Sequence, residues 1–585
     1  MDPIASRAPA SVRRAVTEPK APRRNPGPSL LLHELERLKV TYDPAAATRK
    51  LELLDQLEGA RFARADEVRR LHETLCFLRA YPDSRALRSF VDRLLRRFAG
   101  RPDLLRHARA LADSGIAGTE IRYRFFAPTA FWLASRWPRQ LVIDWRELEH
   151  ADLLEALLPL VAHPAEAPGL DEYAFSVREW VERLKGPHAS DAAFVIRSLA
   201  GLVMDPFAKE IVFERLDLPV RLKPGPGTPS RTAALGPRAA LHLQRQPLER
   251  SRPITRADVM SAPRGVRRVP HREARRLIDL ARAAMVTRHR DLDVFSYAEP
   301  RDVWWVNCGE GLAFAVFGAI PERRLLLESV YGYLTLKNGV PIGYVLTSAL
   351  FGSSEIAFNV FETFRGAEAA AVYRRVLAMT RRLFGSDTFT IYPYQLGEGN
   401  DEALRSGAWW FYHKLGFRPR DPAVAKLARV ELGRMRRNPA YRSSLATLRR
   451  LAGANLYLGI GRERVDIIGR VPLANIGLSV TRDLAERFGG SSDRGRRACA
   501  AEAARRLGVR SWRRWTAGER LAWERWAPLV CILSGVERWS AAERRALVTV
   551  IRAKGGPSER EFVLRFDRHR KLRAAFRRLA AAGAP

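Results

Sequence analysis

The stretches FRGAEAA, residues 364–370, and WWFYHKLGFRP, residues 409–419, decide the fold of this 585-residue chain. The first follows an apolar run typical of a strand and precedes a long run with helical spacing. A strand that enters a helix through such a turn aims several backbone N–H groups at one point, where the helix dipole also attracts anions. We expect a pyrophosphate to fit there, and small residues let it approach the backbone: Ala367, Ala369 and Ala370.

The second stretch predicts a short aromatic-rich helix that ends at Gly416, because glycine favours a helix C-terminus. TFTIYPY, residues 388–394, predicts a strand between the two stretches. FRP, residues 417–419, predicts another after the aromatic helix. The predicted order is therefore strand, Arg-Gly turn, long helix, strand, helix, strand.

This order resembles the GNAT superfamily of acyl-CoA-dependent N-acyltransferases. In that family the turn reads approximately Arg/Gln-x-x-Gly-x-Gly/Ala, and about fifty residues later a helical Tyr precedes x-Lys-x-Gly-Phe. Here Arg365 and Gly366 open the first element, and YHKLGF, residues 412–417, matches the second. The resemblance covers about residues 265–422 and implies an α/β core with a mixed, mostly antiparallel sheet.

The resemblance also implies a role for individual residues toward a co-substrate, acetyl-CoA or another acyl-CoA. Tyr412 would be the general acid that protonates the departing thiolate. The backbone N–H of Val360, with Phe361 beside it, would bind the thioester carbonyl as an oxyanion donor. The pyrophosphate would bind Arg365, Gly366, Ala367, Ala369 and Ala370.

The chemistry further needs a base, because an ammonium must lose a proton before it attacks. Glu362, at the end of the strand, is the candidate, acting directly or through water; an ordinary exposed carboxylate at a strand end is the alternative. Two positions depart from the family pattern. Glu368 replaces the glycine expected in the middle of the turn, and Arg405 replaces a common Asn. The connection at residues 392–406 looks longer than usual and is a candidate lid.

Alternating apolar residues predict antiparallel strands before the Arg-Gly turn, and Asn338-Gly339 is a strong hairpin signal between two of them. We divide the chain into a disordered basic tail at 1–28, a mainly helical N-terminal domain at 29–223 and a linker at 224–264. The GNAT-like domain at 265–422 and a basic helical domain at 423–585 follow. Residues 209–222 read as a further strand pair within the N-terminal domain.

The formal net charge of +36 indicates a polyanionic partner, with nucleic acid the first to consider. Residues 423–585 carry an excess of about twenty positive charges, whereas residues 300–422 are near neutral. An arginine-rich composition without a binding role is the alternative. The four cysteines are scattered without metal-ligand spacing, so we predict no metal site. With no run of 18 apolar residues, we expect no membrane span and a cytoplasmic location.

Three functions remain open. The first is transfer of an acyl group from acyl-CoA to a primary amine on a small molecule or peptide. The second is an aminoacyl-tRNA-dependent transferase on the same fold, which the basic flank and Glu368 would suit. The third is a non-catalytic scaffold that holds an anionic partner through its arginine-rich flanks.

Overall fold

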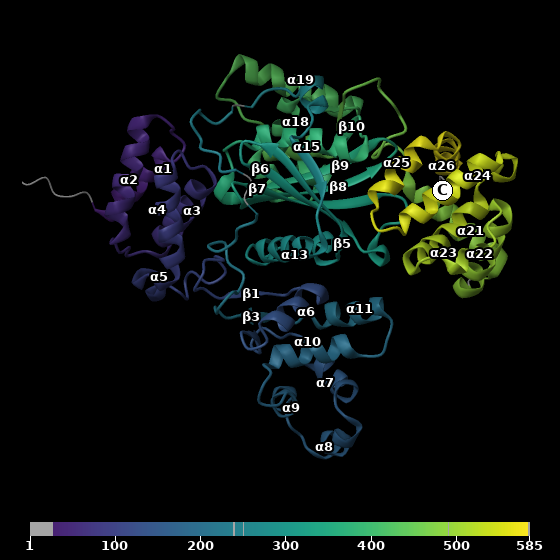
Figure 1. Ribbon diagram of the computed structural model, residues 1–585, viewed down its shortest axis with the longest axis horizontal. Helices are drawn as coiled ribbons and strands as arrows, with labels where there is room; N and C mark the ends of the chain where they lie inside the picture. Colours follow the sequence, from purple (N-terminus) through teal and green to yellow (C-terminus); the bar gives the residue numbers. More distant parts are fainter. Residues whose placement is uncertain (1–26, 238–239, 250, 490, 583–585) are drawn as a thin grey trace, which may run out of the picture.

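The computed structural model describes residues 27–237, 240–249, 251–489 and 491–582. The basic tail predicted at 1–28 lies almost wholly outside this part. A large sheet occupies the middle of the molecule, with helical regions before and after it in the chain (Figure 1). This confirms the predicted class: mixed α/β structure with a mostly antiparallel sheet and helical flanks. In the part of the chain that the structure describes, no helix combines the length and apolarity needed to cross a membrane.

The central sheet has nine strands in the order β11-β12-β10-β9-β8-β7-β6-β5-β4. Asn338 and Gly339 both have positive φ, the geometry of a tight hairpin turn, as their sequence predicts. The strand bounds are β4 (Gly265–Arg268), β5 (Ala298–Gly309), β6 (Leu312–Ala319), β7 (Ser329–Lys337), β8 (Val340–Leu350), β9 (Ser353–Val360), β10 (Thr388–Ile391), β11 (Arg418–Pro419) and β12 (Leu456–Gly459).

One strand pair, β9 with β10, is parallel, and helix α15 (Ala369–Phe384) connects the two strands. Their pairing is short: Ser353 to Glu355 face Thr388 to Thr390. Beyond this point β10 ends, while β9 continues to Val360 alongside β8. The sheet is therefore forked between β9 and β10, because no strand of the described residues pairs with the second half of β9 on that side.

Helices cover both faces of the sheet. α15, α18 (Ala408–Leu415) and α19 (Pro422–Arg437) lie on one side, and α13 (His271–Val286) lies on the other (Figure 1). The apolar residues of α13 recur every three or four positions and face the core: Ala274, Leu277, Ile278 and Ala281.

Strand β12 comes from the part of the chain that the sequence assigns to the helical C-terminal domain. It lies between β10 and β11 and is antiparallel to both. Its four residues are too few to show an alternating pattern, so hydrophobic periodicity does not reveal it. The sheet therefore extends beyond residue 422.

The N-terminal region forms two units. Helices α1 (Pro28–Leu38), α2 (Pro44–Glu58), α3 (Ala65–Ala80), α4 (Arg85–Arg97) and α5 (Pro102–Arg106) share the main hydrophobic core with the sheet. A second unit has its own core, with helices α6 (Ala127–Arg136), α7 (Ala151–Val161), α8 (Ala167–Glu172), α9 (Val177–Leu184), α10 (Asp191–Gly201) and α11 (Pro206–Leu216) around strands β1 (Ile121–Tyr123), β2 (Leu141–Ile143) and β3 (Val220–Leu222).

Residues 209–222 are not a strand pair. Most of them belong to α11, and β3 alone follows. The Asp205 side chain accepts hydrogen bonds from the backbone N–H groups of Phe207 and Ala208, and Pro206 occupies the first helical position. Both features start a helix, and they outweigh the β-branched residues that suggested strands.

The C-terminal helices are α20 (Leu445–Ala452), α21 (Leu473–Phe488), α22 (Ser492–Leu507), α23 (Ala517–Ile532), α24 (Ala541–Lys554), α25 (Arg560–Arg568) and α26 (Arg570–Ala582). They share the main core with the sheet. Trp523 and Trp526 on α23 are fully buried, and the Trp526 Nε1 donates to the carbonyl oxygen of Leu326 at 3.1 Å. Trp526 therefore attaches α23 to the sheet domain, whereas the Trp523 Nε1 donates to the carbonyl oxygen of Ala500 on α22.

Candidate active site

A cavity of about 280 Å³ lies at the fork of the sheet. Its walls come from the free end of β9, the turn that leads into α15, helix α18 and the connection after β10. The lining residues are Phe358, Asn359, Val360, Arg365, Gly366, Ala369, Gln395, Asn400, Glu402, Ala403, Ser406, Ala408, Phe411 and Tyr412. The cavity thus brings together the two sequence stretches that indicated the fold.

The backbone of β9 alternates its hydrogen bonds between the two sides of the strand. Phe361 N–H donates to the carbonyl oxygen of Ile342 on the β8 side at 2.9 Å. The preceding residue, Val360, faces Gly343 in the antiparallel register, so its N–H points away from β8. Beyond the fork this is the side on which β10 has ended, and Val360 lines the cavity. The Val360 amide is therefore placed to donate a hydrogen bond to a group in the cavity.

Phe361 is placed differently. Its amide is held by Ile342, its side chain is buried, and Arg288 stacks 3.7 Å from the centre of its ring. Phe361 is outside the cavity lining and supports the strand end from behind.

Tyr412 lies on α18 and lines the same cavity. Its side chain is almost fully buried, and burial holds its pKa well above the usual value, opposed in part by a backbone hydrogen bond from Phe358. The phenol is therefore protonated at neutral pH. Phe358 precedes Val360 by two residues, so the two N–H groups point to the same side of β9. A carbonyl bound at Val360 would lie near the Tyr412 hydroxyl.

The turn between β9 and α15 has the predicted form. Gly366 has φ +80°, which favours glycine, and α15 begins at Ala369. Arg365, Gly366 and Ala369 line the cavity, so the N-terminus of α15 opens into it. Ala370 is buried and Ala367 is half-buried, and both lie outside the lining.

Glu368 points away from this cavity. Its Oε2 accepts a hydrogen bond from Lys337 Nζ at 2.8 Å, and its side chain lines a different cavity. The negative charge of Glu368 is therefore paired, and it does not enter the space beside the turn.

Glu402 is a site residue that the sequence did not reveal. It lies on α17 (Asp401–Ser406) at the cavity and forms ion pairs with Arg365 and with Arg290, the latter at 3.5 Å. The hydrogen bond from Arg365 is the main reason why the pKa of Glu402 is lowered. α16 (Pro393–Leu396) and α17 form the connection predicted as a lid, and Gln395 and Asn400 from it line the cavity.

The candidate base, Glu362, lies in a 3₁₀ turn after β9 and is exposed, outside the cavity lining. Another carboxylate, Glu355, lies on β9 at the last pair before the fork. Burial, reinforced by the charge of Glu328, raises the pKa of Glu355 to about 7. Its cross-strand partner Ser348 donates a hydrogen bond to Glu328 at 3.1 Å. Glu355 is therefore a half-buried acid whose pKa is raised toward neutrality.

Helix α3 of the N-terminal region supports the turn from outside. The Thr363 hydroxyl donates to the carboxylate of Glu73, and Phe364 stacks with Phe77 at a centroid distance of 6.3 Å.

His413, next to Tyr412, stacks on Trp409, and burial lowers its pKa to about 4. In the described ranges no group of three or more His, Cys, Asp and Glu side chains is arranged to hold a metal ion.

Comparisons with known proteins add no name to this site. No family model matches the chain, no curated protein is significantly similar to it, and no solved structure matches its fold.

Proposed function

We propose that this protein is a GNAT-like N-acyltransferase that transfers an acyl group from acyl-CoA to a primary amine. One observation carries the proposal: a single cavity at the fork of β9 and β10 is lined by the N-terminus of α15, by Val360 and by Tyr412. The parallel β9–α15–β10 unit and the Tyr-bearing helix that follows it support the same assignment.

The turn and the first residues of α15 would bind the pyrophosphate of CoA, since free N–H groups and a helix dipole favour a phosphate there. Arg365, which forms an ion pair with Glu402, would leave that carboxylate and bind the pyrophosphate instead. The pantetheine arm would then follow the free edge of β9 toward Tyr412.

In the reaction, the uncharged amine attacks the thioester carbon and forms the new C–N bond. The carbonyl oxygen becomes an oxyanion, which the Val360 N–H stabilises. Collapse of this intermediate breaks the C–S bond, and the departing sulfur takes the proton of Tyr412. The amine proton is removed by a base, and the proton on Tyr412 is replaced from water.

Glu355 is the better supported base, because its pKa near 7 lets it accept a proton at neutral pH. At about 3.3 Å per strand residue, it lies about 16 Å along β9 from Val360, which would hold the carbonyl, so the proton transfer has to run through a chain of water molecules. Side chains alternate along a strand, so Glu355 and Phe358 face opposite sides of the sheet. The amine would therefore enter the fork from the face opposite α15.

The test is turnover of acetyl-CoA and longer acyl-CoAs with a panel of primary amines, followed by release of free CoA. In Tyr412→Phe we expect turnover to fall by about a hundredfold or more, because a general acid typically accelerates a reaction by at least that factor. CoA affinity should be nearly unchanged. Tyr394→Phe is the matched control, because Tyr394 is exposed on α16. Equal turnover in Tyr412→Phe and the control would reject the assignment.

An aminoacyl-tRNA donor is the second candidate, favoured by the position of α19 and α20. α20 packs against α16 and α17, and Arg449 on α20 lies 3.6 Å from Asp401 on α17. The basic flank thus reaches the connection that covers the cavity. Binding of tRNA with a steep salt dependence, and no thermal stabilisation by any acyl-CoA, would favour this donor. Binding of a polyanion without transfer would favour a scaffold.

A further inference from the structure

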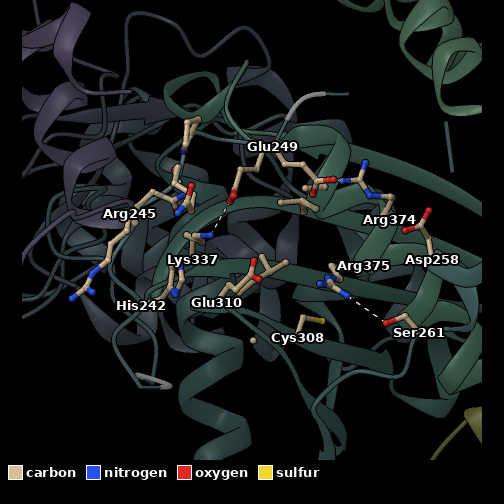
Figure 2. A pocket seen from close by; sticks show the side chains of 18 of the residues that line it. His242, Arg245, Glu249, Asp258, Ser261, Cys308, Glu310, Lys337, Arg374 and Arg375 are labelled. Atoms are coloured by element: carbon tan, nitrogen blue, oxygen red, sulfur yellow. Dashed lines mark hydrogen bonds and ion pairs between the residues drawn. The ribbon is translucent and has the colours of Figure 1, made fainter. Parts of the chain in front are cut away.

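A second, larger cavity of about 670 Å³ lies beside the first half of α15 (Figure 2). It shares no lining residue with the cavity that contains Tyr412. Its walls are the β5–β6 turn, the end of β7, α15 and the segment 242–261, in which residue 250 is not described. A volume of this size holds a small metabolite.

Segment 242–261 is held in place at both ends. Near its start, the Asn338 side chain accepts from His242 N–H at 2.9 Å and donates to the His242 carbonyl oxygen at 3.0 Å. Further on, Ile254 N–H donates to the carbonyl oxygen of Leu415, the last residue of α18, at 2.8 Å. The segment read as a linker in the sequence is therefore a fixed wall of this cavity.

Arg374 is a buried cation in the wall, with a side chain that is 5% exposed. Among the described residues, Arg374 forms an ion pair with Glu249 alone. The Glu249 side chain is half-exposed, and it also lies 3.5 Å from Arg252. Within the described residues, Arg374 Nη1 has no hydrogen-bond partner. A buried guanidinium N–H without an acceptor is costly, and a ligand oxygen in the cavity would satisfy it.

The remaining charges of the wall leave an excess of positive charge. Lys337 is paired with Glu368, and Arg252 with Asp258 at 2.7 Å. Arg375 makes one long hydrogen bond, to Ser261 at 3.4 Å, and Figure 2 shows it directed across the cavity toward that residue. Among the described residues that line the cavity, the cations Arg245 and Arg375 form no ion pair, and Glu310 is the one carboxylate without an ion pair. Two unpaired positive charges therefore face one unpaired negative charge.

We propose that this cavity binds a small molecule carrying a phosphate or carboxylate group, with Arg374 and Arg375 as its ligands. In this arrangement the Glu249 carboxylate occupies the place that the ligand anion takes in the complex. The site is independent of acyl transfer: it lies on the other side of the α15 N-terminus, and it stands even if the acyltransferase proposal fails.

The test is calorimetric titration of the full-length protein at low salt with inorganic phosphate, glucose 6-phosphate and succinate. We expect saturable binding at one site for at least one probe. Phosphate-bearing probes alone would identify a phosphate ligand, and succinate alone a dicarboxylate. Arg375→Gln should weaken that binding by tenfold or more. Glu249→Gln should tighten it, because Arg374 would lose its competing carboxylate.

Two controls keep the test decisive. Arg382→Gln removes an exposed charge from the last turn of the same helix and should leave binding unchanged. Ala371→Phe fills the cavity without a change of charge and should abolish binding, with Tm as the check that the variant folds. The proposal is overturned if no probe binds saturably, or if Arg375→Gln and Arg382→Gln weaken binding equally, since that pattern reports only the general positive field.

Discussion

Lys337 Nζ donates a hydrogen bond to Glu368 Oε2 at 2.8 Å, and the two side chains are 2% and 12% exposed. Glu368 directly precedes α15, whose first residue lines the Tyr412 cavity, yet its carboxylate lies in the wall of the second cavity. The ion pair therefore fixes the start of α15 from the side opposite the proposed phosphate position. It explains how a glutamate can occupy a turn at which an anion is expected.

Removal of one partner of the Lys337–Glu368 ion pair should destabilise the sheet domain. Glu368→Gln leaves the Lys337 ammonium buried without a counter-charge, a change that costs about 3 kcal/mol in other buried pairs. We expect a lower urea midpoint for the transition that includes the sheet, measured by tryptophan fluorescence. The double variant Lys337→Met with Glu368→Gln should recover most of the loss, since no buried charge remains. A midpoint equal to that of the surface control Glu398→Gln would show that the pair contributes nothing.

The Arg365–Glu402 ion pair should compete with acyl-CoA. Both side chains are about half-exposed, so the pair itself is worth less than about 1 kcal/mol. Glu402→Gln frees Arg365 and removes a negative charge from the cavity mouth, so we expect CoA to bind about threefold more tightly. Arg365→Gln should weaken CoA binding by a similar or larger factor. Isothermal titration at two salt concentrations measures both effects, and an unchanged CoA affinity in both variants would place the phosphates elsewhere.

Asp302 joins the C-terminal helices to the sheet. It is fully buried, and each carboxylate oxygen accepts two hydrogen bonds: Oδ1 from Ser558 and Trp304, Oδ2 from Tyr331 and the Glu559 backbone. Asp302→Asn replaces one acceptor by an N–H₂ group that faces two donors. The free energy of unfolding should fall by about 3 kcal/mol, because unsatisfied buried donors cost about 1–3 kcal/mol each. Limited proteolysis should then cut the 557–560 region faster, whereas an unchanged digestion rate would contradict this role.

Much of the sheet was predictable because its signals are local. Asn338-Gly339 needs two residues with positive φ, and Gly366 needs one, so the sequence alone indicates those turns. The resemblance to the GNAT family led us to expect Val360, Arg365 and Tyr412 at one site, and all three line one cavity. These are cases in which local propensity and the global fold agree.

The remaining features depend on contacts between distant residues. Glu368 forms an ion pair with Lys337 from an earlier strand, and Glu402 forms one with Arg365. The pKa of Glu355 is raised by burial in the folded sheet, and to a lesser extent by the charge of Glu328. Periodicity cannot report such pairs, because it describes one element at a time. The same reason hides β12, whose four residues become a strand only by pairing with β10 and β11.

The pKa of Glu355 leads to a prediction with a defined sign. Burial, with Glu328 as a secondary cause, raises this pKa from 4.5 to about 7 in the folded protein. The folded state therefore binds more protons than the unfolded state between about pH 4.5 and 7, and stability falls as pH rises through this window. Above pH 7 the folded state holds Glu355 as a carboxylate, and this lowers the free energy of unfolding by about 3 kcal/mol at most. Glu355→Gln removes it, so the variant should gain stability relative to the native protein at pH 8 but not at pH 4.

The catalytic rate should rise with pH over the range in which stability falls. If Glu355 accepts the amine proton through water, kcat/KM rises with pH and levels off above an apparent pKa near 7, because only the carboxylate is a base. Glu355→Gln should lower kcat/KM by about a hundredfold and abolish that inflection, while CoA affinity is retained. Glu362→Gln, at the exposed position, should keep both the rate and the inflection. If instead the inflection persists in Glu355→Gln and is lost in Glu362→Gln, Glu362 is the base, and the half-buried position of Glu355 affects stability alone.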